Sequence, residues 1–127
     1  MTEFAIPGVP PGPDLAAATT VVALKNMMSA AELESDRECA DIADDTIAKC
    51  EEDFGPVLRL IIARPGRTGL PEGTESKVFV QFEKLEDARK AAVGLNRVKF
   101  DDRVVETAFL SEADMDRLVA VYPEQNR

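Results

Sequence analysis

The order of two hydrophobic periodicities constrains the fold of this chain more than any other feature of its sequence. Four short runs are rich in β-branched residues or alternate apolar with polar positions, as strands do, and they lie at 21–27, 57–63, 77–82 and 103–109. Two longer stretches, 35–54 and 85–95, place apolar residues three and four positions apart, which is typical of one helix face. This βαββαβ order predicts an α+β, ferredoxin-like fold, in which a four-stranded antiparallel sheet carries two helices on one face.

Serine caps indicate where the helices begin. Ser35 and Glu38 fit a capping box, in which the two side chains satisfy free amides at a helix start, and Gly55 and Pro56 end that helix. Ser111 precedes a third, short stretch with helical spacing of its apolar residues, which are Met115, Leu118, Val119 and Tyr122. We expect this extra C-terminal helix to cover an exposed face of the sheet.

Length and composition favour one folded domain. The chain has 127 residues, close to the usual size of a single domain. Proline and glycine crowd residues 1–19, which we interpret as a flexible arm or linker cut from a longer protein; 20–122 is the expected domain and 123–127 a tail. No apolar run reaches the ~20 residues that cross a bilayer, and the start lacks the layout of a signal peptide, so we expect an intracellular protein without a membrane partner.

Negative charge is concentrated in one segment. Residues 32–53 hold ten acids and two bases, a net −8 out of the formal −9 of the chain. A field of this sign repels phosphate backbones and favours cationic partners. Two interpretations stay open at this point, a solvated helix face and a surface that binds a basic partner.

Cysteine and histidine usage argues against catalysis and metal binding. Cys39 and Cys50 fall on one helix about 16 Å apart, too far for a disulfide, so we expect two buried core thiols. The chain has no histidine, the usual general base and the commonest metal ligand. We therefore expect no enzyme, no metal and no cofactor.

The first and third strand segments resemble those of an RNA recognition motif (RRM). The resemblance covers about residues 20–110 and rests on 22–27 and 75–82. In that family, aromatic rings at three positions of these segments stack on bases, and the matching residues here are Ala23, Lys77 and Phe79. Loss of two rings at ~1–3 kcal/mol each implies poor RNA binding, with Phe79 as a weak RNA contact.

Further segments are similar to one branch of that family, the U2AF-homology motif (UHM) of nuclear pre-mRNA splicing factors. Residues 24–28 resemble its Leu-x-Asn-Met, 78–82 its Ile-Phe-Val-Glu-Phe, and 95–100 followed by 103–105 its Leu-Asn-Gly-Arg-x-Phe and Arg-Val-Val. The resemblance implies a module that binds one tryptophan of a short basic peptide from another splicing factor, of the branch-point-binding or U2-particle scaffold type. The implied peptide-binding residues are Asp41, Asp44, Asp45, Arg97, Lys99 and Phe100.

The chain departs from that branch at the expected pocket. The family arginine falls on Val98, and Arg97 takes the place of the family glycine. Lys49 stands where the family has an acid. The arginine–carboxylate pair beside the family pocket is therefore absent or rebuilt by Arg97.

Two other hypotheses compete with peptide binding. One is a weak RNA-binding RRM that uses Phe79 or its loops. The other is a self-association domain whose C-terminal helix covers the sheet of a neighbour. The charge of the preferred ligand separates the first of these from peptide binding.

Overall fold

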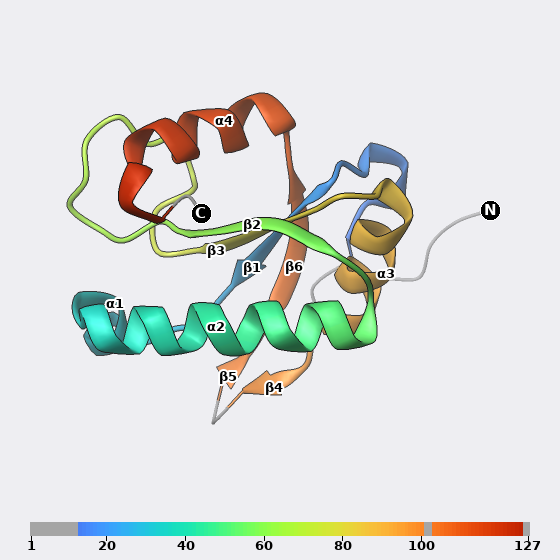
Figure 1. Cartoon of the computed structure of the whole chain (residues 1–127), viewed down its shortest axis with the longest axis horizontal. Coiled ribbons are helices and arrows are strands. Elements are labelled where there is room, and N and C mark those ends of the chain that lie inside the picture. The colour runs from blue at the N-terminus through green and yellow to red at the C-terminus, as the bar shows by residue number, and fades with distance from the viewer. Residues whose placement is uncertain (1–12, 101–102, 126–127) are drawn as a thin grey trace, which may run out of the picture.

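A computed structural model describes residues 13–100 and 103–125 of the chain, and for Phe100 the backbone alone. Its main sheet has four antiparallel strands in the order β2-β3-β1-β6. These strands are β1 (Val21–Lys25), β2 (Val57–Ile62), β3 (Val78–Phe82) and β6 (Glu106–Leu110). Helices α2 (Asp36–Asp53) and α3 (Leu85–Leu95) pack on one face of the sheet (Figure 1). The predicted βαββαβ order is confirmed.

Strand alternation gives the sheet two apolar faces. Leu24, Leu60 and Val80 belong to the core beneath α2 and α3. Their neighbours Ile61 and Phe79 belong to a second core on the opposite side. Strands whose two faces are both buried read as nearly continuous apolar runs, and β2 and β3 have that character.

Helix α2 begins and ends where its sequence predicts. The hydroxyl of Ser35 accepts a hydrogen bond from the amide of Glu38 at 3.2 Å. Past the C-terminus, a Cβ at Gly55 would lie 2.0 Å from Oδ2 of Asp87, so glycine is required there by close packing against α3. The helix buries a stripe of Cys39, Ile42, Thr46 and Cys50, and both cysteines are free thiols in the core, as predicted.

A short helix that the sequence analysis did not predict precedes α2. Helix α1 (Ala30–Glu34) starts with a reciprocal capping box, in which Ser29 N–H donates to Glu32 Oε1 at 2.8 Å and Glu32 N–H donates to Ser29 Oγ at 3.1 Å. Its C-cap, Ser35, is also the N-cap of α2. The two helices therefore meet at one residue.

The prediction of one strand over 103–109 was wrong. Residues Arg103–Val104 form β5, which pairs with β4 (Lys99–Phe100) in a separate two-stranded sheet. The next residue, Val105, is 5% exposed and exchanges backbone hydrogen bonds with Arg97 and Val98, which continue the pairing of the hairpin. The change of pairing partner after Val105 therefore divides the expected strand into a hairpin arm and the sheet strand β6.

The C-terminal helix α4 (Glu112–Val121) covers the second face of the sheet, as predicted (Figure 1). Met115, Leu118 and Tyr122 are 0% exposed and pack over the second core, which includes Phe79. A short 3-10 turn, η2 (Pro123–Gln125), follows α4, and its Gln125 hydrogen-bonds to β2. Residues 123–125 are therefore part of the folded domain.

Candidate functional site: a pocket between α2 and α3

An apolar pocket of about 150 Å³ opens between α2, the end of α3 and the start of the hairpin. Five parts of the chain line it: β1 with the residue after the following turn, α2, the end of α3, the turn before β4, and the break between β5 and β6. The lining residues are Leu24, Met27, Ile42, Asp45, Thr46, Lys49, Cys50, Leu95, Val98 and Val105. A cavity of this size and lining accommodates a small aromatic ring.

The outer wall of the pocket is built on a strained turn. Arg97 has φ of +71°, and its N–H donates to Val105 O at 2.6 Å. Val105 N–H in turn donates to Val98 O at 2.9 Å, which holds two lining valines together. A non-glycine residue in this left-handed conformation costs about 1–2 kcal/mol. Glycine adopts this conformation without that cost, whereas here an arginine occupies it.

Polar contacts attach the hairpin to α1. The Arg103 guanidinium lies 3.0 Å from Glu32 Oε1 and donates to the carbonyl of Met27, a lining residue, at 3.3 Å. Asn26 Nδ2 donates to Val104 O at 3.1 Å. The Ser29 amide, with a further contribution from Arg103, holds the pKa of Glu32 below its usual value. Arg103 and Glu32 were missed as site residues, although the Ser29-x-x-Glu32 spacing was a usable signal.

Acidic side chains stand beside the pocket on α2. Asp41, Asp44 and Asp45 are all exposed, and Asp45 lies at the pocket itself. Asp41 is one helical turn before Asp45, so the two carboxylates share a helix face. A cationic segment of a ligand whose ring occupies the pocket would meet these groups at the rim.

Basic residues near the pocket differ in their contacts. Lys49 lines the pocket, but its Nζ is 2.7 Å from Asp53 Oδ2, and that hydrogen bond raises the pKa of Lys49. Arg97 and Lys99 are exposed and are not among the lining residues. The side chain of Phe100 lies outside the described residues, and its backbone is in β4 next to the pocket wall.

The interior of the pocket is neutral. Cys50 is 1% exposed, and burial raises the pKa of its thiol to about 11. Thr46 is 7% exposed, and Ile42 and Leu24 complete an apolar base. The interior therefore favours an uncharged ring or aliphatic group, while charge is restricted to the rim.

The opposite face of the sheet offers no comparable opening at the base-stacking positions. Phe79 is 1% exposed and Ala23 is 7% exposed, both beneath α4. An RNA contact by Phe79 would require α4 to leave the sheet. Within residues 13–100 and 103–125, no group of acids and cysteines is arranged to hold a metal ion, and no helix is long and apolar enough to cross a membrane.

Comparison with known proteins gives a consistent family. The RNA recognition motif family matches residues 40–106, more than half of the chain. A U2af large-subunit splicing factor of Nicotiana plumbaginifolia is 34% identical over 97 residues, which are 76% of this chain and 17% of that protein. Splicing factor 45 of Homo sapiens is 36% identical over 91 residues, which are 72% of this chain and 21% of that protein. The chain thus spans about a fifth or less of these relatives.

A solved structure of the Rna15 RRM with bound RNA is also similar. It is 20% identical, with a TM-score of 0.48, and the match covers 84% of this chain and 98% of that one.

Proposed function

This chain belongs to the RNA recognition motif family and is similar to the large subunits of U2AF and to splicing factor 45, and from this premise we propose that it is a protein-interaction module of a splicing factor. Its ligand is a short basic peptide with one tryptophan. The tryptophan ring enters the pocket between α2 and α3, and Asp41, Asp44 and Asp45 meet the cationic residues beside it.

The contrast between the two sheet faces carries this proposal. The face that stacks bases in the family is closed by α4, whereas the helix face has an open apolar pocket with carboxylates at its rim. A buried aromatic ring in a small pocket is a typical anchor of a peptide complex. An exposed ion pair contributes only ~0–1 kcal/mol, so the acids mainly orient the peptide and raise the association rate.

The similarity to splicing factors supports a splicing protein as the partner. Such a peptide would come from another splicing protein, of the branch-point-binding or U2-particle scaffold type, and the complex would form in the nucleus. Phe100 is proposed, from the resemblance of residues 95–100 to the family segment, to supply a ring face to the tryptophan. Arg97 and Lys99 are proposed to border the peptide from the same hairpin.

A fluorescence titration tests the proposal. The chain has no tryptophan, so the emission of a basic peptide with a single tryptophan reports on that ring alone. We expect a saturable blue shift on addition of the domain. Asp41→Asn combined with Asp45→Asn should weaken binding about tenfold at low salt, and Phe100→Ala should abolish the blue shift.

Controls keep the result specific to the pocket. Glu38→Gln with Glu52→Gln removes two exposed α2 carboxylates that do not line the pocket, and it should leave the affinity within about threefold. Circular dichroism of each variant confirms the fold. An unshifted emission spectrum at saturating domain would contradict the proposal, and binding of oligopyrimidine RNA instead would favour the weak RNA-binding alternative.

A further inference from the structure

A second and larger hollow, of about 700 Å³, lies on the other flank of α2. It follows the free edge of β2, the outermost strand of the main sheet. Its walls come from α2, β2 and the segments after β2 and α4. The lining residues are Asp36, Cys39, Ala40, Ala43, Ile47, Val57, Leu58, Arg59, Leu60, Ile62, Arg64, Arg67, Glu124 and Gln125. We call this hollow the edge groove.

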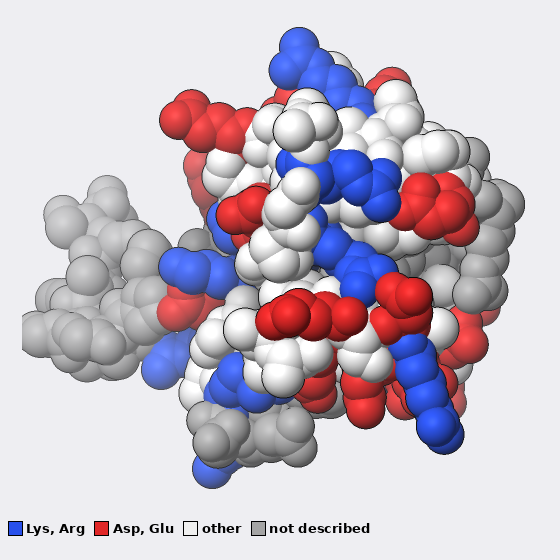
Figure 2. Space-filling view, turned by 90° about the vertical axis from the view of Figure 1, so that its left-hand side faces the viewer, with Lys and Arg blue, Asp and Glu red and all other residues white. Residues whose placement is uncertain are grey.

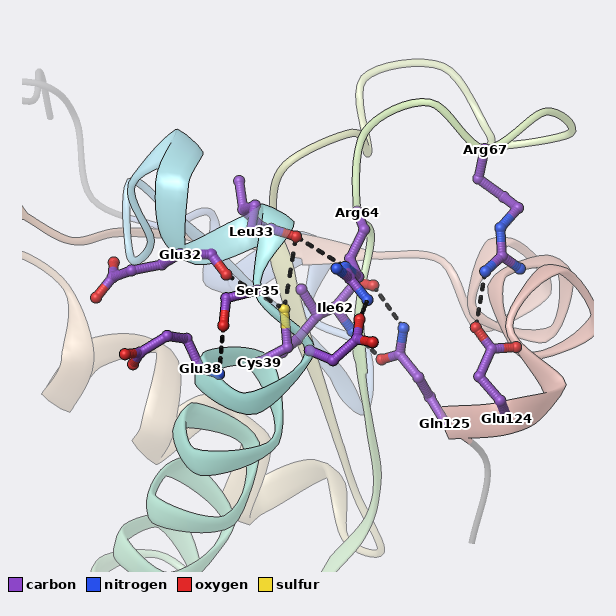
Figure 3. A network of polar contacts seen from close by, with 11 residues as sticks. Glu32, Leu33, Ser35, Glu38, Cys39, Ile62, Arg64, Arg67, Glu124 and Gln125 are labelled. Carbon is purple, nitrogen blue, oxygen red and sulfur yellow. Dashed lines mark hydrogen bonds and ion pairs between the residues drawn. The ribbon is translucent and has the colours of Figure 1, made fainter.

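At one residue of this edge, Ile62, a glutamine side chain already makes the hydrogen bonds that a neighbouring strand would make. Ala63 N–H donates to Lys77 O, so Ala63 directs its backbone groups toward β3 and its neighbour Lys77. Because these directions alternate along a strand, the N–H and C=O groups of Ile62 and Leu60 point away from β3, toward the free edge. The amide of Gln125 pairs with both groups of Ile62, with N···Oε1 of 2.7 Å and Nε2···O of 2.9 Å (Figure 3). A neighbouring strand would make the same pair of hydrogen bonds.

Leu60 is the next residue of β2 whose backbone groups face the free edge, and it lines the edge groove. In Figure 1, β2 passes in front of the other strands, with α2 on one side and α4 on the other. The flank of α2 above this edge carries Ala40, Ala43 and Ile47, at helical spacing and outside the main buried stripe. A strand added beside Leu60 would pack its side chains against these small apolar residues.

The opposite side of the edge groove has a cation with an unsatisfied nitrogen. Arg59 lies two residues before Ile61, so its side chain is on the α4 face, and its buried Nε has no hydrogen-bond partner among the described residues. The other two arginines of the groove are paired, Arg64 with Asp36 at 2.6 Å and Arg67 with Glu124 at 2.8 Å. Figure 2 shows this end of the molecule with basic and acidic side chains interspersed.

From these observations we propose that the edge groove binds an extended segment of another protein as a fifth strand beside Leu60, with apolar residues toward α2 and a carboxylate between them toward Arg59. The alternation of a strand places such residues on opposite faces, which matches the apolar flank on one side and the cation on the other. This site is on the opposite flank of α2 from the tryptophan pocket. It is therefore independent of the peptide proposed above.

Charge argues against a second copy of this chain as the occupant. Two β2 strands paired antiparallel through Leu60 would place both Arg59 side chains on the same face, near each other. In that register the two arginines are diagonal neighbours about 7–8 Å apart, and like charges at that separation repel each other. An acidic strand removes this repulsion and supplies the acceptor that the Nε of Arg59 lacks.

The test uses two blocked heptapeptides, one that alternates valine with glutamate and one that alternates valine with lysine. Binding is followed by amide hydrogen exchange and ¹⁵N chemical shifts of the domain. We expect the glutamate peptide to bind at least about tenfold more tightly than the lysine peptide, and to slow exchange of the Leu60 amide. The Ile62 amide, already bound by Gln125, should change little.

Two matched pairs of variants make the test decisive. Ala40→Arg places a long side chain in the edge groove and should abolish binding. Ala48→Arg, at another exposed alanine of α2 that lines neither hollow, should not. Arg59→Glu should reverse the preference between the two peptides, and Arg89→Glu, an exposed arginine on α3, should keep it.

The proposal is overturned if neither peptide protects Leu60, or if Ala48→Arg abolishes binding as fully as Ala40→Arg. A glutamate preference that survives Arg59→Glu would also overturn it. Light scattering at the titration concentrations detects a dimer, and protection of Leu60 that depends on domain concentration without peptide would assign the edge to a second copy instead.

Discussion

The two faces of the sheet are both apolar, yet the chain covers them in different ways. On one face, α4 packs Leu118 and Tyr122 over Phe79 so tightly that each is at most 1% exposed, and the Tyr122 hydroxyl donates to Arg64 O at 2.7 Å. On the other face, α2 and α3 leave an open pocket beside exposed carboxylates. The comparison shows that the face carrying the base-stacking positions of the family is buried here, while the helix face has an opening to solvent.

The largest effect is expected from truncation on the α4 face. Leu118→Ala removes a fully buried side chain and should lower the free energy of unfolding by ~2–5 kcal/mol in urea denaturation. Val98→Ala at the pocket, where the side chain is 38% exposed, should cost under ~1 kcal/mol. Equal losses at the two positions would remove the distinction between a structural face and a binding face.

Alkaline pH should destabilise the pocket face through Cys50. Because burial raises the pKa of this thiol from 9.0 to about 11, its stabilising effect is complete below pH 9 and is lost as the pH rises through 11. The loss corresponds to about 2–3 kcal/mol. The measurement is the free energy of unfolding from urea titrations between pH 8.5 and 11. It should decline less with rising pH in Cys50→Ala than in the unchanged chain.

Tyr122 on the α4 face provides the internal comparison for that experiment. Burial also raises the pKa of the Tyr122 hydroxyl, so ionisation of Tyr122 should destabilise the fold at alkaline pH as well. The loss of unfolding free energy that persists in Cys50→Ala should include this effect. A decline that is identical with and without Cys50 would mean that the thiol is hydrated in the native state.

A stabilising substitution is expected at the strained turn beside the pocket. Arg97→Gly relieves the left-handed backbone at φ of +71°, and it should raise the midpoint of thermal unfolding by a few degrees, equivalent to about 1 kcal/mol. Val98→Gly, one residue later, serves as the control and should destabilise. A lower midpoint for Arg97→Gly would show that the arginine side chain contributes contacts that outweigh the strain.

The smallest predicted effect concerns the attachment of the hairpin at acid pH. The Ser29 amide, together with Arg103, lowers the pKa of Glu32, so the stabilisation is present above the ordinary carboxyl pKa of 4.5 and is lost as the pH falls below it. Glu32→Gln should therefore weaken the pH dependence of stability between pH 5 and 3 by under ~1 kcal/mol. Glu34→Gln, at an exposed neighbour, serves as the matched control.

Strong periodicity and helix caps made most of the fold predictable from the sequence. The strands of the main sheet, α2, α3 and α4 follow from alternation, three-to-four spacing and the Ser35 and Ser111 caps. Helix α1 was missed because five residues carry too little periodicity, although Ser29 and Glu32 form a capping box. The split at Val105 was missed because Val104 and Val105 both favour a strand, and no local signal shows that the pairing partner changes between them and Glu106.

The candidate site was less predictable than the fold. The acids on α2 were identified from charge, and Asp45 lies at the pocket. The apolar lining, in contrast, comes from segments up to 81 residues apart, from Leu24 to Val105, and no local pattern links them. The same holds for Gln125 and Ile62 at the sheet edge, whose pairing depends on tertiary packing alone.

Peptide binding on the helix face is tested most directly by mapping two ligands on one ¹⁵N-labelled sample of the domain. A basic peptide with one tryptophan should shift the amides of Thr46, Leu95 and Val98 at the pocket and leave Ala23 and Phe79 unchanged, while an oligopyrimidine RNA at the same concentration should shift neither set. RNA-induced shifts at Ala23 and Phe79, with no response of the pocket amides to the peptide, would contradict the account.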